Sequence, residues 1–214
     1  MARQMLPHSF RTYMNIPAGQ ASVFLIDDDP AFLELHAALL GSINLNVHCF
    51  LSSVAFLDAN LSLSCGCILS DLRMPVMGGL QLQSELLARD IDTPIIFITG
   101  HADVPTAVEA MRRGAFDYVE KPVHAQLLLD RVNAALTLSR ERHDERMQRQ
   151  ARAARLALLT AQERKIAQWV AQGRSSREIA EITSLSVRTV ENHRARLMDK
   201  LHVTSAVQLV RLLL

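Results

Sequence analysis

The sequence predicts an α/β protein with a doubly wound parallel sheet, followed by an all-α helix-turn-helix domain. Five short apolar segments alternate with segments of helical periodicity up to about residue 138, whereas residues 156–214 show helical periodicity only. The charge also changes along the chain. Residues 21–139 contain six Lys/Arg and 14 Asp/Glu. Residues 140–214 contain 15 Lys/Arg and eight Asp/Glu. An acidic half followed by a basic half indicates two domains with different partners.

The five apolar segments are continuous rather than alternating, which is typical of parallel strands buried on both faces. Between them, Pro30 opens a helix that Gly41 stops, Ser52 caps a short helix, and Gly114 ends a later one. The expected strands are 23–26, 45–50, 67–70, 95–98 and 117–119, and the expected helices are 30–41, 52–57, 80–87, 103–114 and one from about 124.

The remaining segments differ in composition. Residues 1–20 mix Pro, Gly and polar residues without a period, which predicts a flexible extension, and either Met1 or Met14 can be the natural start. Residues 139–155 are dense in charge and lack Gly and Pro, which predicts a helical linker. We therefore expect an α/β domain over 21–138, a linker over 139–155 and a helix-turn-helix domain over 156–214.

Composition excludes several classes of protein. No apolar run is long enough to span a bilayer, and the N-terminus lacks the apolar core of a signal peptide, so we expect a cytoplasmic protein without a membrane partner. The three cysteines, Cys49, Cys65 and Cys67, fit a reducing compartment. Cys65 and Cys67 are too close together for the usual zinc spacing, so we expect ordinary thiols.

Polar residues follow the expected strands at one edge of the sheet. The first strand ends in Asp27, Asp28 and Asp29, the third in Asp71 and the fourth in Thr99, and Lys121 follows the fifth. Carboxyl ends of parallel strands meet at one edge, where ligands bind. Clustered carboxylates repel one another unless a cation neutralises them, and hard oxygens suit Mg²⁺. A carboxylate can attack a phosphoryl group, and an ammonium and a hydroxyl can offset the charge that develops.

Four segments carry a family resemblance: VFLIDDD (23–29), SDLRMPVMGG (70–79), FITGH (97–101) and DYVEKP (117–122). They resemble the receiver domain of bacterial two-component response regulators, in particular the FixJ-like branch, over about residues 21–139. The resemblance implies a flavodoxin-like (βα)5 doubly wound receiver domain that is phosphorylated by a sensor histidine kinase. It also implies a cis peptide before Pro122.

By this resemblance, Asp71 is the phosphoacceptor, Thr99 meets the phosphoryl group, Lys121 is its ion partner and Tyr118 is an aromatic switch. The implied Mg²⁺ ligands are Asp27, Asp28, Asp71 and the backbone carbonyl of Arg73. Asp29 is a third acid beyond the usual pair, so the metal assignment within 27–29 stays open. The resemblance further implies a homodimer on phosphorylation, through a face made of residues 103–113, 117–119 and 123–138.

The basic end shows the signals of a helix-turn-helix. Thr160 caps a helix and forms a capping box with Glu163, Ser176 caps a short helix, and Ser186 caps a longer one to Leu201. On that longer helix the inward side is Val190, Leu197 and Leu201, and the outward side is Arg188, Glu191, Asn192, Ala195 and Asp199. A short helix, a turn and a helix with a polar face are typical of the helix-turn-helix DNA-binding motif.

LTAQE (159–163), AQG (171–173), REIA (177–180) and SVRTVENHR (186–194) resemble the LuxR/FixJ-type (FixJ/NarL) DNA-binding domain over about residues 156–214. The resemblance implies that Glu191, Asn192 and Ala195 face bases. It implies phosphate contacts by Arg188, Arg194, Arg196 and Lys200, and a dimer contact by a last helix over about 204–213. Two departures are Thr183 at a usually apolar position and Ser184 where the turn often has Gly.

Three other readings remain open. Aspartyl-phosphate phosphatases also use a strand-end Asp, but they need a second acid two residues on, and position 73 is Arg. A small-molecule sensor would need an apolar, aromatic-walled pocket, whereas residues 21–139 contain no Trp. A receiver that no longer accepts phosphate is disfavoured by the Asp71, Thr99 and Lys121 set. We expect no enzyme but a phosphorylation-dependent transcriptional regulator, by default an activator, with promoter DNA and RNA polymerase as partners.

Overall fold

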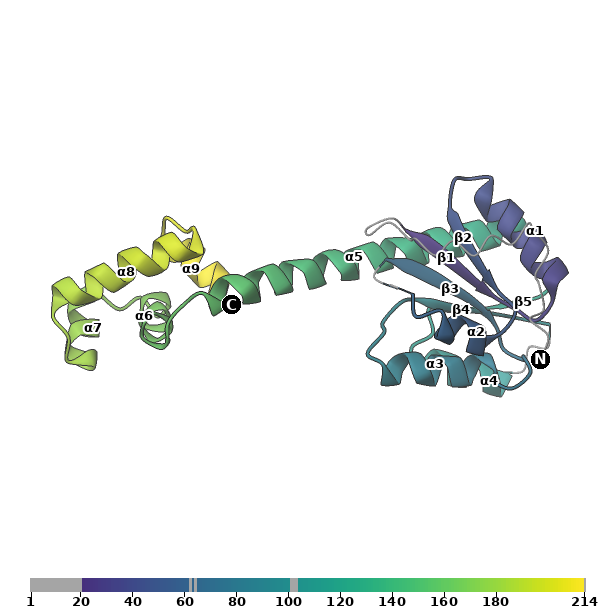
Figure 1. The fold of residues 1–214 in the computed structure, drawn as a ribbon, viewed down its shortest axis with the longest axis horizontal. Coiled ribbons are helices and arrows are strands. Elements are labelled where there is room, and N and C mark those ends of the chain that lie inside the picture. Colours follow the sequence, from purple (N-terminus) through teal and green to yellow (C-terminus); the bar gives the residue numbers. More distant parts are fainter. Residues whose placement is uncertain (1–20, 62, 64, 101–103, 214) are drawn as a thin grey trace. The chain divides into compact units, whose positions relative to one another are not determined.

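The computed structural model describes residues 21–61, 63, 65–100 and 104–213 (Figure 1). The chain divides into two compact units, with the boundary between His143 and Asp144. The predictions for residues 1–20, for His101 and for the helix start at Asp103 lie outside the described residues.

The N-terminal unit is built on a five-stranded parallel sheet in the order β2-β1-β3-β4-β5. β1 and β3 are buried throughout, as the continuous apolar segments predicted. The order reverses between β1 and β3, which makes that edge the topological switch point. The strands are β1 (Ser22–Ile26), β2 (Asn46–Phe50), β3 (Gly66–Asp71), β4 (Ile95–Thr99) and β5 (Asp117–Glu120).

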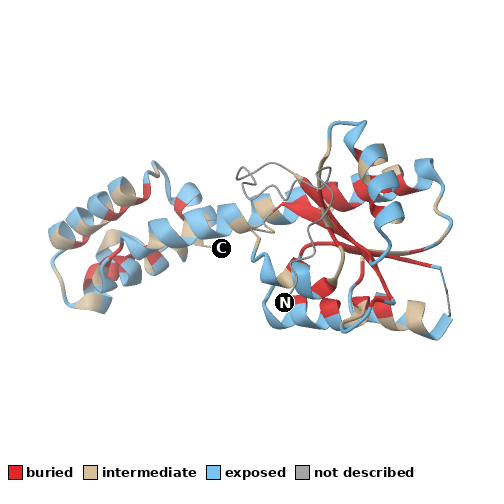
Figure 2. Ribbon diagram, turned by 45° about the vertical axis from the view of Figure 1, so that its right-hand side comes forward, coloured by how far each residue is buried: buried red, intermediate tan, exposed pale blue. Residues whose placement is uncertain are grey.

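Helices cover both faces of this sheet (Figure 2). On one face, Leu33 and Leu40 of α1 and Leu128 and Val132 of α5 pack with apolar side chains of the strands. On the other face, α2, α3 and α4 contribute a second cluster that includes Phe56, Leu82, Leu86 and Ala110. The helices are α1 (Pro30–Gly41), α2 (Ser53–Asp58), α3 (Gly79–Ala88), α4 (Val104–Arg112) and α5 (Ala125–Ala157).

Local signals explain where these helices begin and end. The Asp29 side chain accepts a hydrogen bond from the amide of Ala31 and Pro30 occupies the first turn, so α1 starts where the chain was expected to turn. Ser52 caps α2 by accepting from the amide of Ala55. α5 continues without interruption through the charged segment 139–155, as the absence of Gly and Pro predicted.

The C-terminal unit is helical, with the end of α5 followed by α6 (Ala161–Ala171), α7 (Ser176–Thr183), α8 (Val187–Leu201) and α9 (Ala206–Leu213). Its core is a separate apolar cluster. The expected inward side of α8 is confirmed, because Val190, Leu197 and Leu201 are fully buried. α7, a short turn and α8 form the predicted helix-turn-helix.

One capping prediction was wrong by a single residue. Ser175, not Ser176, caps α7: its hydroxyl accepts from the amide of Glu178, whose carboxylate accepts from the amide of Ser175. A capping box needs the acid three residues after the cap, and Glu178 stands three after Ser175. The predicted capping box at Thr160 and the predicted cap at Ser186 are confirmed.

The two departures in the turn before α8 have local explanations. Ser184 adopts a left-handed conformation with φ 55°, the conformation for which Gly is usual at a helix end. The Thr183 hydroxyl donates to the carbonyl of Ile179, so its polar atom is satisfied within α7. The three cysteines are free thiols. Among the described helices, none combines the length and the apolarity needed to cross a membrane.

Candidate functional site

The strand register brings Asp27 and Asp71 together. Ile26 of β1 pairs with Ser70 of β3, so the two aspartates, each one residue further on, lie side by side at the switch point. Both side chains are buried, with Asp27 2% and Asp71 7% exposed. Two neighbouring buried carboxylates require a cation, because each disfavours ionisation of the other.

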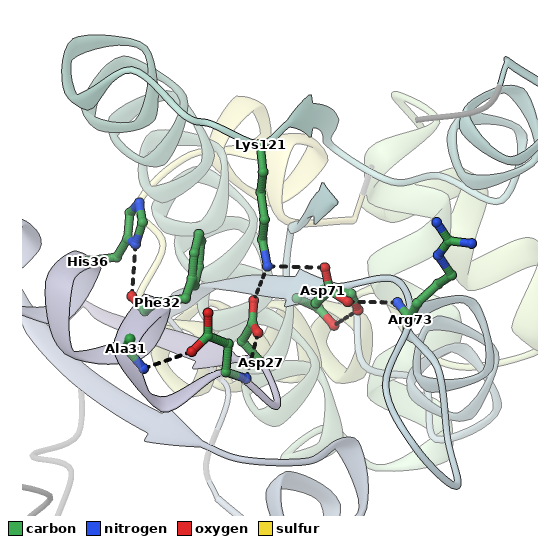
Figure 3. Close-up of polar contacts among 9 residues, drawn as sticks. Asp27, Ala31, Phe32, His36, Asp71, Arg73 and Lys121 are labelled. Carbon is green, nitrogen blue, oxygen red and sulfur yellow. Dashed lines mark hydrogen bonds and ion pairs between the residues drawn. The ribbon is translucent and has the colours of Figure 1, made fainter. Parts of the chain in front are cut away.

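Lys121 supplies that positive charge (Figure 3). Its Nζ lies 2.6 Å from Oδ2 of Asp27 and 3.3 Å from Oδ1 of Asp71. The Lys121 amide donates to the carbonyl of Thr99, and the peptide between Lys121 and Pro122 is cis, as expected. The structure therefore places two of the predicted acidic site residues in direct contact with the predicted lysine.

The electrostatics of this group follow from its burial. Burial raises the pKa of Asp27 above its ordinary value, although the hydrogen bond from Lys121 and that from the amide of Asp29 oppose the rise. Burial alone lowers the pKa of Lys121, but the hydrogen bond to Asp27 and the negative charges of Asp27 and Asp71 outweigh it, so the pKa of Lys121 is raised. Lys121 is therefore a fixed ammonium at neutral pH.

The loop after β3 holds the Asp71 carboxylate from the other side. The amide of Arg73 donates to Oδ2 of Asp71 at 2.8 Å. Gly79, which begins α3, passes so close to the strand that an added Cβ would lie 2.6 Å from the Asp71 carbonyl oxygen and 2.8 Å from the Phe97 ring. Only glycine fits this approach, so the loop between Asp71 and α3 can stay tight.

The other predicted residues lie around this centre. Thr99 is buried at the carboxyl end of β4, and Tyr118 is partly buried on β5. Asp28 is exposed beside Asp27, and Asp29 is engaged as the cap of α1. Among the described residues, no three His, Cys, Asp or Glu side chains lie close enough together to hold a metal ion by themselves.

The oxygens nevertheless fit Mg²⁺. This ion keeps several waters and is usually bound through one or two carboxylates rather than by an all-protein cage. Asp27 and Asp71 provide two carboxylates within reach of one ammonium nitrogen, with Asp28 next in the chain. Asp29 is less available because its carboxylate caps α1.

On α8, the residues expected to face bases form one exposed side. Arg188, Glu191, Asn192, Ala195 and Arg196 are exposed, opposite the buried Val190 and Leu197. Two expected phosphate contacts are engaged within the unit. Arg194 donates to the hydroxyl of Ser176, and Lys200 Nζ lies 2.7 Å from Oε2 of Glu163.

Two contacts of the predicted lysines, one at Lys121 and one at Lys200, could not be found from the sequence. Phe32 places its ring 4.0 Å, measured to the centroid, from Lys121 Nζ. Glu163 was recognised as part of a capping box but not as the partner of Lys200. An apolar residue on an amphipathic helix predicts only core packing, so no local signal distinguished Phe32.

A doubly wound sheet with an acidic pair and a lysine at its switch point, followed by a helix-turn-helix unit, defines a receiver joined to a DNA-binding domain. Comparison with known families agrees: the response regulator receiver domain matches residues 23–133, and the family described as bacterial regulatory proteins, luxR family, matches residues 157–213. The chain belongs to the two-component response regulators with a LuxR-type DNA-binding domain, a family of transcriptional regulators.

Individual relatives cover nearly the whole chain. The transcriptional regulatory protein TdiR of Thauera aromatica is 42% identical over 90% of this chain and 85% of its own length. The transcriptional regulatory protein FixJ of Azorhizobium caulinodans is 42% identical over 90% of this chain and 91% of its own. Among solved structures, the response regulator StyR aligns with a TM-score of 0.86 at 35% identity, covering 91% of this chain and 98% of that one.

Proposed function

We propose that Asp71 accepts a phosphoryl group from a sensor histidine kinase and that this modification makes the protein dimerise and bind promoter DNA. The observation that carries the proposal is the buried Asp27–Lys121–Asp71 contact at the switch point of the sheet. A single group added there changes the charge balance of a site in which one ammonium is shared between two carboxylates.

In the transfer step, a carboxylate oxygen of Asp71 attacks phosphorus, the new O–P bond forms and the N–P bond of the donor phosphohistidine breaks. The imidazole leaves and takes up a proton. Lys121 and the loop amides offset the charge that develops on the phosphoryl oxygens, and Thr99 donates its hydroxyl to one of them. The Arg73 amide keeps the Asp71 carboxylate oriented for attack.

Mg²⁺ would be held by the carboxylates of Asp27, Asp28 and Asp71 and by the carbonyl of Arg73. When bound, it supplies charge neutralisation between the carboxylates and the phosphoryl oxygens. Lys121 then exchanges part of its contact with Asp27 and Asp71 for the incoming group. Asp29 is not assigned to the metal, because it caps α1.

Dimerisation follows from a change at Thr99 and Tyr118, whose side chains reposition when the phosphoryl group is present. Four exposed apolar side chains on α4 and α5 support a dimer face here: Val104 (77% exposed), Val108 (43%), Met111 (46%) and Leu127 (38%). The dimer then binds operator DNA in the cytoplasm, with Glu191, Asn192 and Ala195 facing bases and Arg188, Arg194 and Arg196 contacting phosphates. Lys200 was also expected at a phosphate, but it is not assigned one because its ammonium is paired with buried Glu163. Activation of transcription together with RNA polymerase is the proposed outcome.

Phosphorylation of the full chain by acetyl phosphate with Mg²⁺ tests the proposal. We expect the wild type to gain one phosphoryl group by intact mass, to dimerise in sedimentation and to capture specific genomic fragments. Asp71→Asn should do none of these. Asp58→Asn, which removes an exposed carboxylate on α2, is the matched control and should behave as the wild type. Identical mass, association and DNA capture by wild type and Asp71→Asn would rule the proposal out.

A further inference from the structure

A stack of three side chains stands beside the phosphoacceptor site (Figure 3). The Lys121 ammonium nitrogen lies over the Phe32 ring, 4.0 Å from its centroid. The His36 ring also stacks on Phe32, with 3.8 Å between centroids and 26° between planes. Residues four apart on a helix are neighbours on its surface, so α1 presents the two rings together.

A hydrogen bond within α1 and packing against the core hold the stack in place. His36 is buried, and its Nδ1 lies 2.8 Å from the carbonyl oxygen of Phe32. A carbonyl can only accept, so Nδ1 carries the hydrogen and donates it. This bond fixes the imidazole against the phenyl ring. Phe32 also packs against the core shared by α1 and α5, which limits its movement.

The Lys121 ammonium lies over the face of the Phe32 ring, a geometry that apolar packing alone does not require. The face of an aromatic ring is its negative side, and a cation over that face is attracted most strongly when it is partly removed from water. The Lys121 side chain is 23% exposed, and both of its acidic partners are more deeply buried. The ring therefore covers one side of the ammonium while Asp27 and Asp71 hold its charge.

We propose that Phe32, braced by His36, is a positioning residue for phosphoryl transfer that keeps the Lys121 ammonium directed at the site of the incoming phosphoryl group. This inference rests on the proposed function, because it assigns a role in the same reaction. Phe32 does not touch the reacting atoms. It acts by limiting the positions that Lys121 can take, so that the ammonium need not reorganise when charge develops.

A fluorination series on the full-length protein tests this directly. Replacing Phe32 by 4-fluoro-, 3,5-difluoro- and 3,4,5-trifluorophenylalanine keeps the shape of the ring but progressively weakens its negative face. We expect the rate of Asp71 phosphorylation by acetyl phosphate to fall stepwise, by about two- to tenfold across the series. The midpoint of thermal unfolding should stay unchanged. The same series at Phe116, which packs against the same core, should leave the rate unchanged.

Two single variants give an independent check. Phe32→Tyr should be phosphorylated on Asp71 at the wild-type rate. Phe32→Leu should be slowed about as much as the protein with 3,4,5-trifluorophenylalanine. In nuclear magnetic resonance spectra, the ε-methylene protons of Lys121 should be shifted upfield by the ring in the wild type and in Phe32→Tyr, and this shift should vanish in Phe32→Leu.

The outcomes separate this inference from the function on which it rests. A phosphorylated wild type with a flat fluorination series, or with no upfield shift at Lys121, overturns the role of Phe32 and leaves the proposed function standing. If no protein, wild type included, is modified on Asp71, the proposed function fails and the positioning role fails with it.

Discussion

Lys200 and Glu163 form an ion pair at 2.7 Å, although they stand 37 positions apart in the chain. Glu163 is buried at the start of α6, and its Oε2 also accepts from the amide and the hydroxyl of Thr160. The hydrogen bond from Lys200 and those from Thr160 hold the pKa of Glu163 at about 2. One carboxylate oxygen thus caps α6 and ties it to the C-terminal end of α8.

Loss of the Glu163 contacts should show in the acid stability of the C-terminal unit. The folded pKa of Glu163 lies below its ordinary value of 4.5, so its contribution is complete above about pH 4.5 and is lost as the pH falls toward about 2. Glu163→Gln should lower the free energy of unfolding of the C-terminal unit by about 1–3 kcal/mol at pH 7 and flatten this decline. Urea unfolding followed by the fluorescence of Trp169, the single tryptophan, measures both.

Glu178→Gln is the control for that experiment. Glu178 forms the corresponding capping box on α7, but it is exposed and its ion-pair partner Arg174 is exposed too. Removing its charge should change the pH dependence of the free energy of unfolding much less. Parallel loss of stability in wild type and Glu163→Gln between pH 4.5 and 2 would contradict the prediction.

Two basic residues of α8, Arg188 and Lys200, should affect DNA binding differently. Arg188 is exposed and free to reach a phosphate, whereas Lys200 is tied to Glu163. Arg188→Ala should reduce the slope of log affinity against log salt by about 0.9, the value for one phosphate contact on duplex DNA. Lys200→Met should leave the slope almost unchanged but lower the unfolding free energy by about 1–3 kcal/mol, because Glu163 stays buried without its partner.

Fluorescence anisotropy with one duplex at several salt concentrations measures these slopes. The prediction for Lys200 would be wrong if Lys200→Met reduced the slope as much as Arg188→Ala did. In that case the ammonium leaves Glu163 when DNA binds, as the sequence resemblance implies.

The close approach of Gly79 to β3 should make this position sensitive to an added side chain. Gly79→Ala should destabilise the N-terminal unit by about 1–3 kcal/mol, because the new methyl group would meet backbone at Asp71 and the ring of Phe97. Gly41→Ala at the end of α1 is the matched control. Nothing lies within 4 Å of its added Cβ, so it should be neutral or stabilising by about 0.4–1 kcal/mol. Chemical denaturation followed by circular dichroism distinguishes the two, and equal effects would contradict this account.

The turn before α8 contains a serine in a conformation that favours glycine. Ser184 has φ 55°, which glycine adopts without the steric cost that a Cβ brings. Ser184→Gly should therefore stabilise the C-terminal unit by about 0.5–1 kcal/mol. Ser175→Ala, which removes the cap of α7, should destabilise it by about 1 kcal/mol. Trp169 fluorescence in urea reports both, and a destabilised Ser184→Gly protein would show that the serine side chain has another role.

Much of the fold could be predicted because its signals are local. Continuous apolar strands, the caps at Ser52, Thr160 and Ser186, and the uninterrupted linker helix each depend on residues within a few positions of one another. The one-residue error at Ser176 arose within such a signal, where two adjacent serines compete and the position of Glu178 decides between them.

The sequence by itself determined that Asp27, Asp71, Thr99 and Lys121 stand at strand ends, since parallel strands bring their carboxyl ends to one edge. Only the tertiary structure decided which side chains surround them. The ring of Phe32 over Lys121 and the pairing of Lys200 with Glu163 join residues far apart in the chain. Such contacts depend on how helices pack and which rotamers fit, and periodicity and capping signals carry no information about either.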